Sequence, residues 1–162
     1  MGKGSQKGNF TLEEAAGIAI EVREVLKSFA GKVEVCGSIR RRVLTVGDID
    51  IIVSNPRIDF QQMLYFFYSP LILNGPSKYR FNYTRAQVDI DIYPKETWGA
   101  ALMHATGSKM NNIILRSVAK KKGFQLSKYG LFKDTQLIAG KTEEEIYEAL
   151  GLPYKPPEER SK

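Results

Sequence analysis

Two short acidic motifs in this 162-residue sequence have the residue types and the spacing to do chemistry. Asp48 and Asp50 lie two positions apart in Gly-Asp-Ile-Asp-Ile-Ile-Val, and Asp89 and Asp91 repeat the spacing in Val-Asp-Ile-Asp-Ile. Alternate residues of a β-strand share a face, so each motif puts two carboxylates on one face and aliphatic side chains on the other. If the two strands pair, the carboxylates converge into a site for Mg²⁺ or Mn²⁺. If they do not pair, each motif is a solvated strand edge.

A basic turn precedes the first acidic motif. Gly37 and Ser38 follow an apolar run and lead into Arg40, Arg41 and Arg42. The glycine lets a ligand approach the backbone, the hydroxyl donates a hydrogen bond, and a guanidinium can hold two phosphate oxygens at once. The segment is either a phosphate-binding turn or a charged hairpin corner.

The composition matches an ordinary globular domain, with 43% hydrophobic and 26% charged residues. Lys and Arg number 24 against 18 Asp and Glu, a formal net charge of +6, which favours a polyanionic partner. Cys36 is the only cysteine, which excludes an intrachain disulfide and a multi-cysteine zinc site and suits a reducing compartment. The sequence has no apolar run of about 18 residues or more, so we expect no membrane partner.

The elements that must position these residues fall into two lobes behind a flexible leader, residues 1–9. In the first lobe, 10–95, the hydrophobic pattern predicts helices over 11–30 and 58–68 and strands over 33–39, 49–53, 71–73, 79–83 and 87–92. In the second lobe, 96–162, it predicts helices over 98–105, from the break at 106–108 to about 122, and over 142–150. It also predicts strands over 124–126, 131–133 and 136–138. The prediction is an α+β fold, and we expect Phe66, Phe67 and Trp98 in its core.

The order of these motifs resembles the nucleotidyltransferase signature of the family X DNA polymerases, the group that includes DNA polymerase beta. The signature runs Gly-Ser-x-Arg-Arg, then Gly-Asp-x-Asp, then Asp-x-Asp on a later strand. Later segments extend the likeness: His104-Ala105-Thr106-Gly107-Ser108, Asn112, Arg116, and the stretches 122–124, 129–132 and 144–154. The resemblance covers the chain from about Thr11 onward. It implies a nucleotidyltransferase palm, a mixed β-sheet with flanking helices, followed by a small α/β nucleotide-binding lobe.

The resemblance also implies the metal and its ligands. Asp48 and Asp50 would bind two divalent cations, Mg²⁺ with Mn²⁺ as the alternative, and Asp89 would bind the catalytic one beside the primer 3′-hydroxyl. All three are the expected catalytic residues. Asp91 receives no role because the family varies at its position.

Further implied roles concern the incoming nucleotide. The triphosphate would be held by Gly37, Ser38, Arg41 and Gly47. The sugar and base would be held by His104, Gly107, Ser108 and Asn112, with a cis peptide between Gly107 and Ser108. His104-Ala105 replaces an aromatic pair common in the family, which implies weaker discrimination against ribonucleotides; a packed or base-stacking histidine is the alternative interpretation of His104.

The DNA contacts implied for the second lobe are basic. Arg116 would touch the template strand, and Lys109, Lys120, Lys121 and Lys128 would meet DNA phosphates. The rival interpretation of 120–122 is a lysine-rich helix C-terminus favoured by the helix dipole. Arg80 and Arg85 are further candidates for backbone contact.

We therefore expect a template-directed DNA polymerase that adds dNMP to a primer 3′-hydroxyl with release of pyrophosphate, in short-gap DNA repair. Its partners would be primer-template or gapped DNA and a dNTP. The expected form is a minimal monomeric polymerase without lyase or helix-hairpin-helix domains, similar to the small viral member. It would be intracellular, in cytoplasm or nucleoid, or in the host cell if viral. The alternatives are a template-independent nucleotidyltransferase, against which Asn112 and Arg116 argue, and a catalytically silent DNA-binding scaffold, against which the three acids argue.

Overall fold

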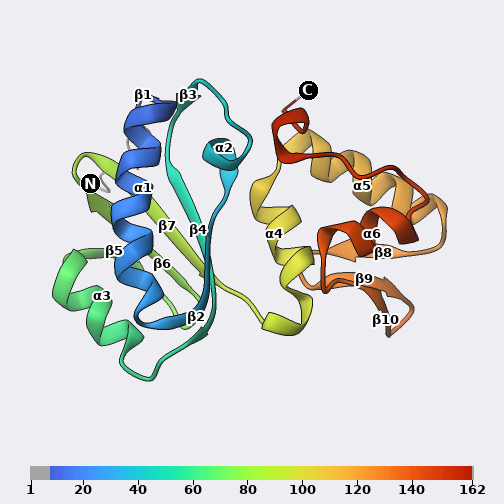
Figure 1. Cartoon of the computed structure of the whole chain (residues 1–162). Coiled ribbons are helices and arrows are strands. Elements are labelled where there is room, and N and C mark those ends of the chain that lie inside the picture. The colour runs from blue at the N-terminus through green and yellow to red at the C-terminus, as the bar shows by residue number, and fades with distance from the viewer. Residues whose placement is uncertain (1–7, 162) are drawn as a thin grey trace, which may run out of the picture.

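The computed structural model describes residues 8–161, which form two lobes (Figure 1). The first lobe is built on a five-stranded sheet in the order β2-β4-β7-β6-β5. The central strands β4 and β7 run parallel, and the other neighbours are antiparallel, so the sheet is mixed. The strands are β2 (Ala30–Val35), β4 (Ile49–Pro56), β5 (Leu71–Asn74), β6 (Lys78–Tyr83) and β7 (Ala86–Ile92).

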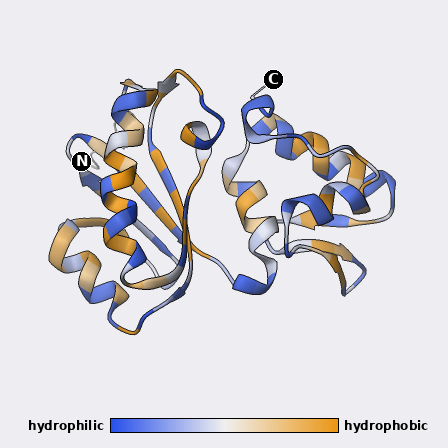
Figure 2. Cartoon of the chain, in the orientation of Figure 1, coloured by the Kyte–Doolittle hydropathy of each residue, from blue (hydrophilic) through white to orange (hydrophobic). Residues whose placement is uncertain are grey.

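Two helices, α1 (Leu12–Lys27) and α3 (Phe60–Tyr68), cover one face of this sheet (Figure 1). Helix α1 begins at a capping box in which Thr11 and Glu14 satisfy each other's backbone N–H groups. Hydrophobic and hydrophilic residues alternate along it (Figure 2), and its buried stripe is Ala15, Ala19, Val22 and Leu26. Burial of this stripe against the sheet fixes which strand face is the core.

The two central strands obey the period of two that the sequence indicates. On β4, Ile49, Ile51 and Val53 enter the core, and on β7, Val88 and Ile90 do the same. The intervening positions therefore point to the opposite face, away from α1 and α3. That opposite face carries the acidic residues.

The second lobe contains α4 (Trp98–Thr106), α5 (Lys109–Lys121), α6 (Glu143–Ala149) and a three-stranded antiparallel sheet. Its strands are β8 (Gln125–Ser127), β9 (Gly130–Lys133) and β10 (Gln136–Ala139). This lobe has a separate apolar core that includes Leu115, Leu131, Ile146 and Leu150. We propose that the lobes divide near residue 95, where the 3₁₀ turn Lys95–Thr97 leads into α4.

A third, smaller apolar cluster joins the lobes. Cys36 and Ile52 from the first lobe pack with Tyr93 and with Ala101 of α4. The C-terminal segment, with the 3₁₀ turn Pro157–Glu159, comes back to the junction, where the Ser108 N–H donates to the Arg160 carbonyl at 3.2 Å. Within residues 8–161, no helix is both long and apolar enough to cross a membrane.

The α+β prediction is confirmed, with local corrections. The strand expected over 33–39 ends at Val35, because Gly37 adopts a φ of +59° and begins the short helix α2 (Gly37–Arg40). Phe66 and Phe67 are 82% and 52% exposed, so their placement in the core was wrong. The sequence pattern also missed the pairing of β1 (Phe10–Thr11) with β3 (Thr45–Val46).

The predicted leader, residues 1–9, lies mostly outside the described residues, which start at Gly8. The Gly8 N–H donates to the Gly47 carbonyl at 2.8 Å, beside the first acidic motif.

Candidate active site

Four aspartates gather on the open face of the first sheet. Asp50 on β4 and Asp89 on β7 are direct partners in the parallel register. Asp48 immediately precedes β4, and Asp91 follows Asp89 by two positions. All four line one pocket of about 390 Å³. The pairing on which the sequence argument depended is therefore present, and it makes one acidic face out of two motifs.

The arginine-rich turn lies against this acidic face. Gly37 opens α2 with a positive φ, and a Cβ atom at this position would collide with the Asp50 carboxylate. The Cys36 N–H donates to the Asp50 carbonyl at 2.7 Å. A glycine is thus required here both by the backbone conformation and by the approach of the acid.

Residues of the turn also reach the second lobe. Arg41 donates from Nη1 to the Thr106 carbonyl at 2.6 Å, from Nη2 to Ser38 Oγ at 3.4 Å and from Nε to Ser161 Oγ at 2.9 Å. A Cβ atom at Gly107 would lie 3.1 Å from Arg41 Nη1. The structure therefore brings the expected phosphate-binding residue Arg41 to the Thr-Gly-Ser turn, and Ser38 contacts Arg41. The Gly107–Ser108 peptide is cis, as predicted.

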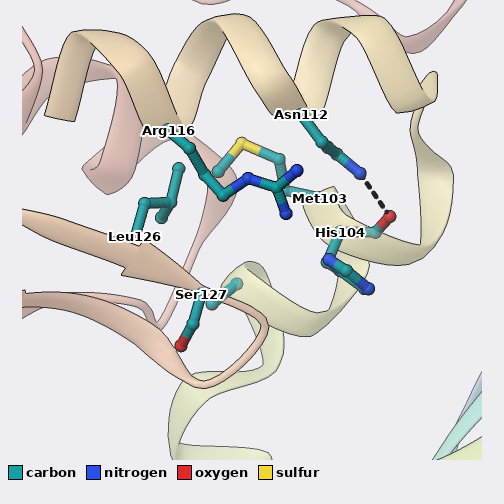
Figure 3. A pocket seen from close by; sticks show the side chains of 7 residues that line it. Met103, His104, Asn112, Arg116, Leu126 and Ser127 are labelled. Carbon is teal, nitrogen blue, oxygen red and sulfur yellow. Dashed lines mark hydrogen bonds between the residues drawn. The ribbon is translucent and has the colours of Figure 1, made fainter. Parts of the chain in front are cut away.

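The residues expected at the nucleotide sugar and base form a separate small pocket in the second lobe. Figure 3 shows His104, Asn112 and Arg116 lining it with Met103, Leu126 and Ser127. Asn112 Nδ2 donates to the His104 carbonyl at 2.9 Å. Desolvation and the charges of Lys128 and Arg116 hold the pKa of His104 below its usual value.

The lysines expected to contact DNA are distributed over two elements. Lys109, Lys120 and Lys121 lie exposed on α5. Lys128 is in the β8–β9 turn, where its ammonium lies 5.8 Å from the Tyr93 ring centroid and 5.4 Å from that of Tyr129. Lys128 therefore makes cation–π contacts with two aromatic rings at the lobe junction.

Two basic residues inside the acidic pocket were not anticipated there. Arg80 Nε donates to Asp89 Oδ1 at 2.6 Å, and Lys78 Nζ lies 3.4 Å from Asp91 Oδ1. The Lys-x-Arg spacing of 78–80 predicts two basic side chains on one strand face. It places them beside the acids only once β6 is known to pair with β7.

A buried ion cluster between the lobes was also missed. Glu143, at the start of α6, is 3% exposed and accepts two hydrogen bonds from Arg40, at 2.8 and 3.0 Å. Arg160, which is fully buried, donates to Glu143 at 2.7 Å, and Tyr154 adds its hydroxyl at 3.2 Å. Burial alone would raise the pKa of Glu143, but the hydrogen bonds and charges of the two arginines lower it below its ordinary value. Nothing in the sequence marks Glu143 beyond its place after the capping residue Thr142.

The acidic pocket fits a divalent cation in the type of its donors. Hard carboxylate oxygens line one face of two adjacent strands, as Mg²⁺ and Mn²⁺ require. Within the described residues, however, no group of three or more Asp, Glu, His or Cys side chains stands in metal-holding geometry. At Asp89 both carboxylate oxygens accept hydrogen bonds, one from Arg80 and one from Gln87.

Comparisons with known proteins agree with this architecture. A family model described as the DNA polymerase beta palm matches residues 12–78, and one described as the DNA polymerase beta thumb matches residues 101–161. The DNA polymerase/3′-5′ exonuclease PolX of Bacillus subtilis is 33% identical over 97% of this chain. The repair DNA polymerase X of African swine fever virus is 26% identical over 85% of this chain and 86% of its own length.

A solved structure shows the same fold. Leishmania infantum polymerase beta, in a ternary P/T complex, superposes with a TM-score of 0.83 at 24% identity, covering 96% of this chain and 77% of that one. The palm and the lobe that follows it in the sequence define a nucleotidyltransferase fold. The chain belongs to the DNA polymerase beta family, family X of the DNA polymerases. It spans 29% of the length of the Bacillus subtilis relative.

Proposed function

We propose that this chain is a template-directed DNA polymerase, which adds dNMP to a primer 3′-hydroxyl and releases pyrophosphate. The observation that carries the proposal is the register of β4 and β7, which sets Asp50 beside Asp89 on the face that Asp48 shares. Short-gap repair inside the cell is the proposed setting, and the viral relatives, which are repair DNA polymerases, support it. The DNA partner would be a primer-template or a gapped duplex.

The proposed metal ligands are Asp48, Asp50 and Asp89, for Mg²⁺ or Mn²⁺. Two bound cations would supply a lowered pKa for the primer hydroxyl and neutralise charge on the triphosphate. In this chain, the aspartates provide the oxygen ligands, and Gly37 lets the turn approach Asp50 closely.

The residues around the acidic face have proposed roles in holding the nucleotide. Ser38 and Arg41, with the backbone at Gly37 and Gly47, hold the phosphates. Arg41 suits this role because three hydrogen bonds to neutral oxygens hold its guanidinium in place, and its charge lies close enough to Asp50 to interact with the edge of the acidic face. The sugar and base are assigned to the residues His104, Gly107, Ser108 and Asn112. The template and its phosphates are assigned to the basic residues Lys109, Arg116, Lys120, Lys121 and Lys128.

Primer extension tests the proposal. The substrates are a template-primer, a one-nucleotide gap with and without a 5′-phosphate, and single-stranded DNA, each with Mg²⁺ or Mn²⁺ and single nucleotides. We expect addition of the templated nucleotide only, and loss of that addition in Asp89→Ala. Asp91→Ala is the matched control, because it removes the same group from the same strand face at a position with no assigned role.

Two outcomes would overturn the proposal. Untemplated addition would identify a template-independent transferase. Folded protein that binds DNA without adding nucleotides would identify a scaffold.

Sugar selection is a separate expectation from the nucleotide pocket. His104-Ala105 stands where the family commonly has an aromatic pair, so we expect less bulk against a ribose 2′-hydroxyl. We expect the ratio of kcat/KM for dNTP over rNTP to be only about tenfold, which is about 1.4 kcal/mol. A ratio of several thousand in matched steady-state assays would contradict this.

A further inference from the structure

Two positive charges on β6 face two negative charges on β7. Arg80 is the direct register partner of Asp89, and Lys78 is the direct partner of Asp91. The strands are antiparallel, so residues that are directly opposite share a face and their side chains meet. The positive pair therefore lies on the same face as the proposed metal ligands, and all of these residues line the same pocket.

The two oxygens of Asp89 are held in unequal ways. Oδ2 accepts from Gln87 Nε2 at 2.9 Å, and Gln87 is only 2% exposed. Oδ1 accepts from Arg80 Nε at 2.6 Å, and the Arg80 side chain is 35% exposed. A buried amide is fixed by its surroundings, whereas a long, partly solvated arginine can swing into water. Gln87 is thus the fixed partner of Asp89 and Arg80 the exchangeable one.

The guanidinium of Arg80 also interacts with the other acids. Its hydrogen bond to Asp89, together with the charges of Asp89, Asp48 and Asp50, raises the pKa of Arg80 despite an opposing effect of desolvation. One monovalent cation of this chain thereby neutralises part of the acidic face that Asp48, Asp50 and Asp89 form. Like charges gathered on one face repel, so a counter-charge is needed when no metal is bound.

We propose that Arg80 is a positioning residue that holds Asp89 through Oδ1 in the metal-free protein and gives up this oxygen to a divalent cation. The proposal rests on the metal role assigned to Asp89 above. A carboxylate oxygen in an ion pair with a guanidinium is a poor ligand for a second positive charge, because the two cations repel. Arg80 and the metal therefore compete for Asp89, while Gln87 keeps the carboxylate oriented in both states.

The test is binding of Mn²⁺ alone, measured by the electron paramagnetic resonance signal of the free ion, without DNA or nucleotide. The variants are Arg80→Met, which keeps the aliphatic stem and removes the charge, and Lys78→Met as matched control. Both remove one positive charge from the same face of β6, so any long-range charge effect is common to them. We expect Arg80→Met to bind Mn²⁺ about tenfold more tightly than wild type, which is about 1.4 kcal/mol. Lys78→Met should bind about threefold more tightly or less, because its ion pair is more exposed.

The outcomes separate this inference from the proposed function. If wild type binds Mn²⁺, Asp89→Asn abolishes binding, and Arg80→Met equals Lys78→Met, then the metal role of Asp89 holds and the competition by Arg80 is wrong. If neither wild type nor Arg80→Met binds Mn²⁺ in any way that depends on Asp89, both the competition and the metal role of Asp89 are overturned. Arg80→Gln replaces Arg80→Met if circular dichroism shows that the latter is unfolded.

Discussion

The arginine–carboxylate pairs at the lobe junction and in the acidic pocket differ mainly in their access to water. At the lobe junction, Glu143 and Arg160 are 3% and 0% exposed, and Arg40 completes the cluster. In the acidic pocket, the side chains of Arg80 and Asp89 are 35% and 18% exposed. The bond distances are similar, 2.7–2.8 Å in the first and 2.6 Å in the second.

The difference shows that distance does not determine what an ion pair does. A buried charge cannot lose its partner without a large desolvation penalty. We therefore expect the Glu143 cluster, in which Arg40 of the first lobe pairs with Glu143 of the second, to stabilise the contact between the lobes. In a partly solvated pair, either residue can leave its partner at a small cost in free energy. The Arg80–Asp89 pair is therefore suited to a site that binds and releases ligands.

The largest expected effect is on catalysis, from loss of Asp89 in the partly solvated pair. Asp89→Ala should lower the rate of nucleotide addition at least a thousandfold, about 4 kcal/mol of transition-state stabilisation, because it removes a proposed metal ligand. The free energy of unfolding should change by about 1 kcal/mol or less. Single-turnover kinetics and urea denaturation measure the two quantities. If Asp89→Ala were strongly destabilised but still active, Asp89 would have a structural rather than a catalytic role.

The buried pair should behave in the opposite way. Glu143→Gln leaves Arg160 buried without its charged partner, so we expect a loss of about 3 kcal/mol in the free energy of unfolding. Urea denaturation measures it, with the exposed neighbour Glu144→Gln as control, for which a change within about 0.5 kcal/mol is expected. Equal stability of the two variants would show that the charge of Glu143 does not stabilise the fold.

Acid should reduce the stabilisation that the charge of Glu143 provides, by no more than the loss expected for Glu143→Gln. The two arginines hold the folded-state pKa of Glu143 below its ordinary value of 4.5, although burial opposes them. A depressed folded-state pKa contributes stability that is fully present above pH 4.5 and is lost as the pH falls through the folded-state value. The difference in unfolding free energy between wild type and Glu143→Gln should therefore be constant from neutral pH down to about that point and shrink below it. A difference that grows on acidification would contradict the assigned charge state.

Arg41, beside Arg40 in the sequence, sharpens the comparison. Arg41 follows Arg40 in the chain but donates its hydrogen bonds to neutral oxygens. Arg41→Ala should weaken dNTP binding by about 2 kcal/mol, the contribution of hydrogen bonds to a charged group, and leave DNA affinity nearly unchanged. Fluorescence titrations with labelled DNA and with dNTP compare the two; equal losses would argue against the phosphate role.

The parts predicted from sequence are those that depend on local pattern. The period of two around Asp48 and Asp89 predicted an acidic and an apolar face for each strand, and the helical spacing of apolar residues predicted the helix over 11–30 that is α1. The approach of Arg80 to Asp89 depends on the register of the β6–β7 hairpin, in which the two residues lie directly opposite each other. The hydrophobic pattern indicates both strands but not this register, which is set by the geometry of the turn between them. Glu143 was missed because burial of a charge is recognised only when both of its arginine partners are in place.

The junction cluster described earlier makes Cys36 a built-in reporter of motion between the lobes. This sole thiol is fully buried beside Ile52, Tyr93 and Ala101, and burial raises its pKa well above the usual value, so thiolate is scarce in the closed molecule. A thiol reagent can modify it only when the junction opens. The rate of labelling at a single natural atom therefore measures how often α4 separates from the strands that carry the acids, without any engineered probe.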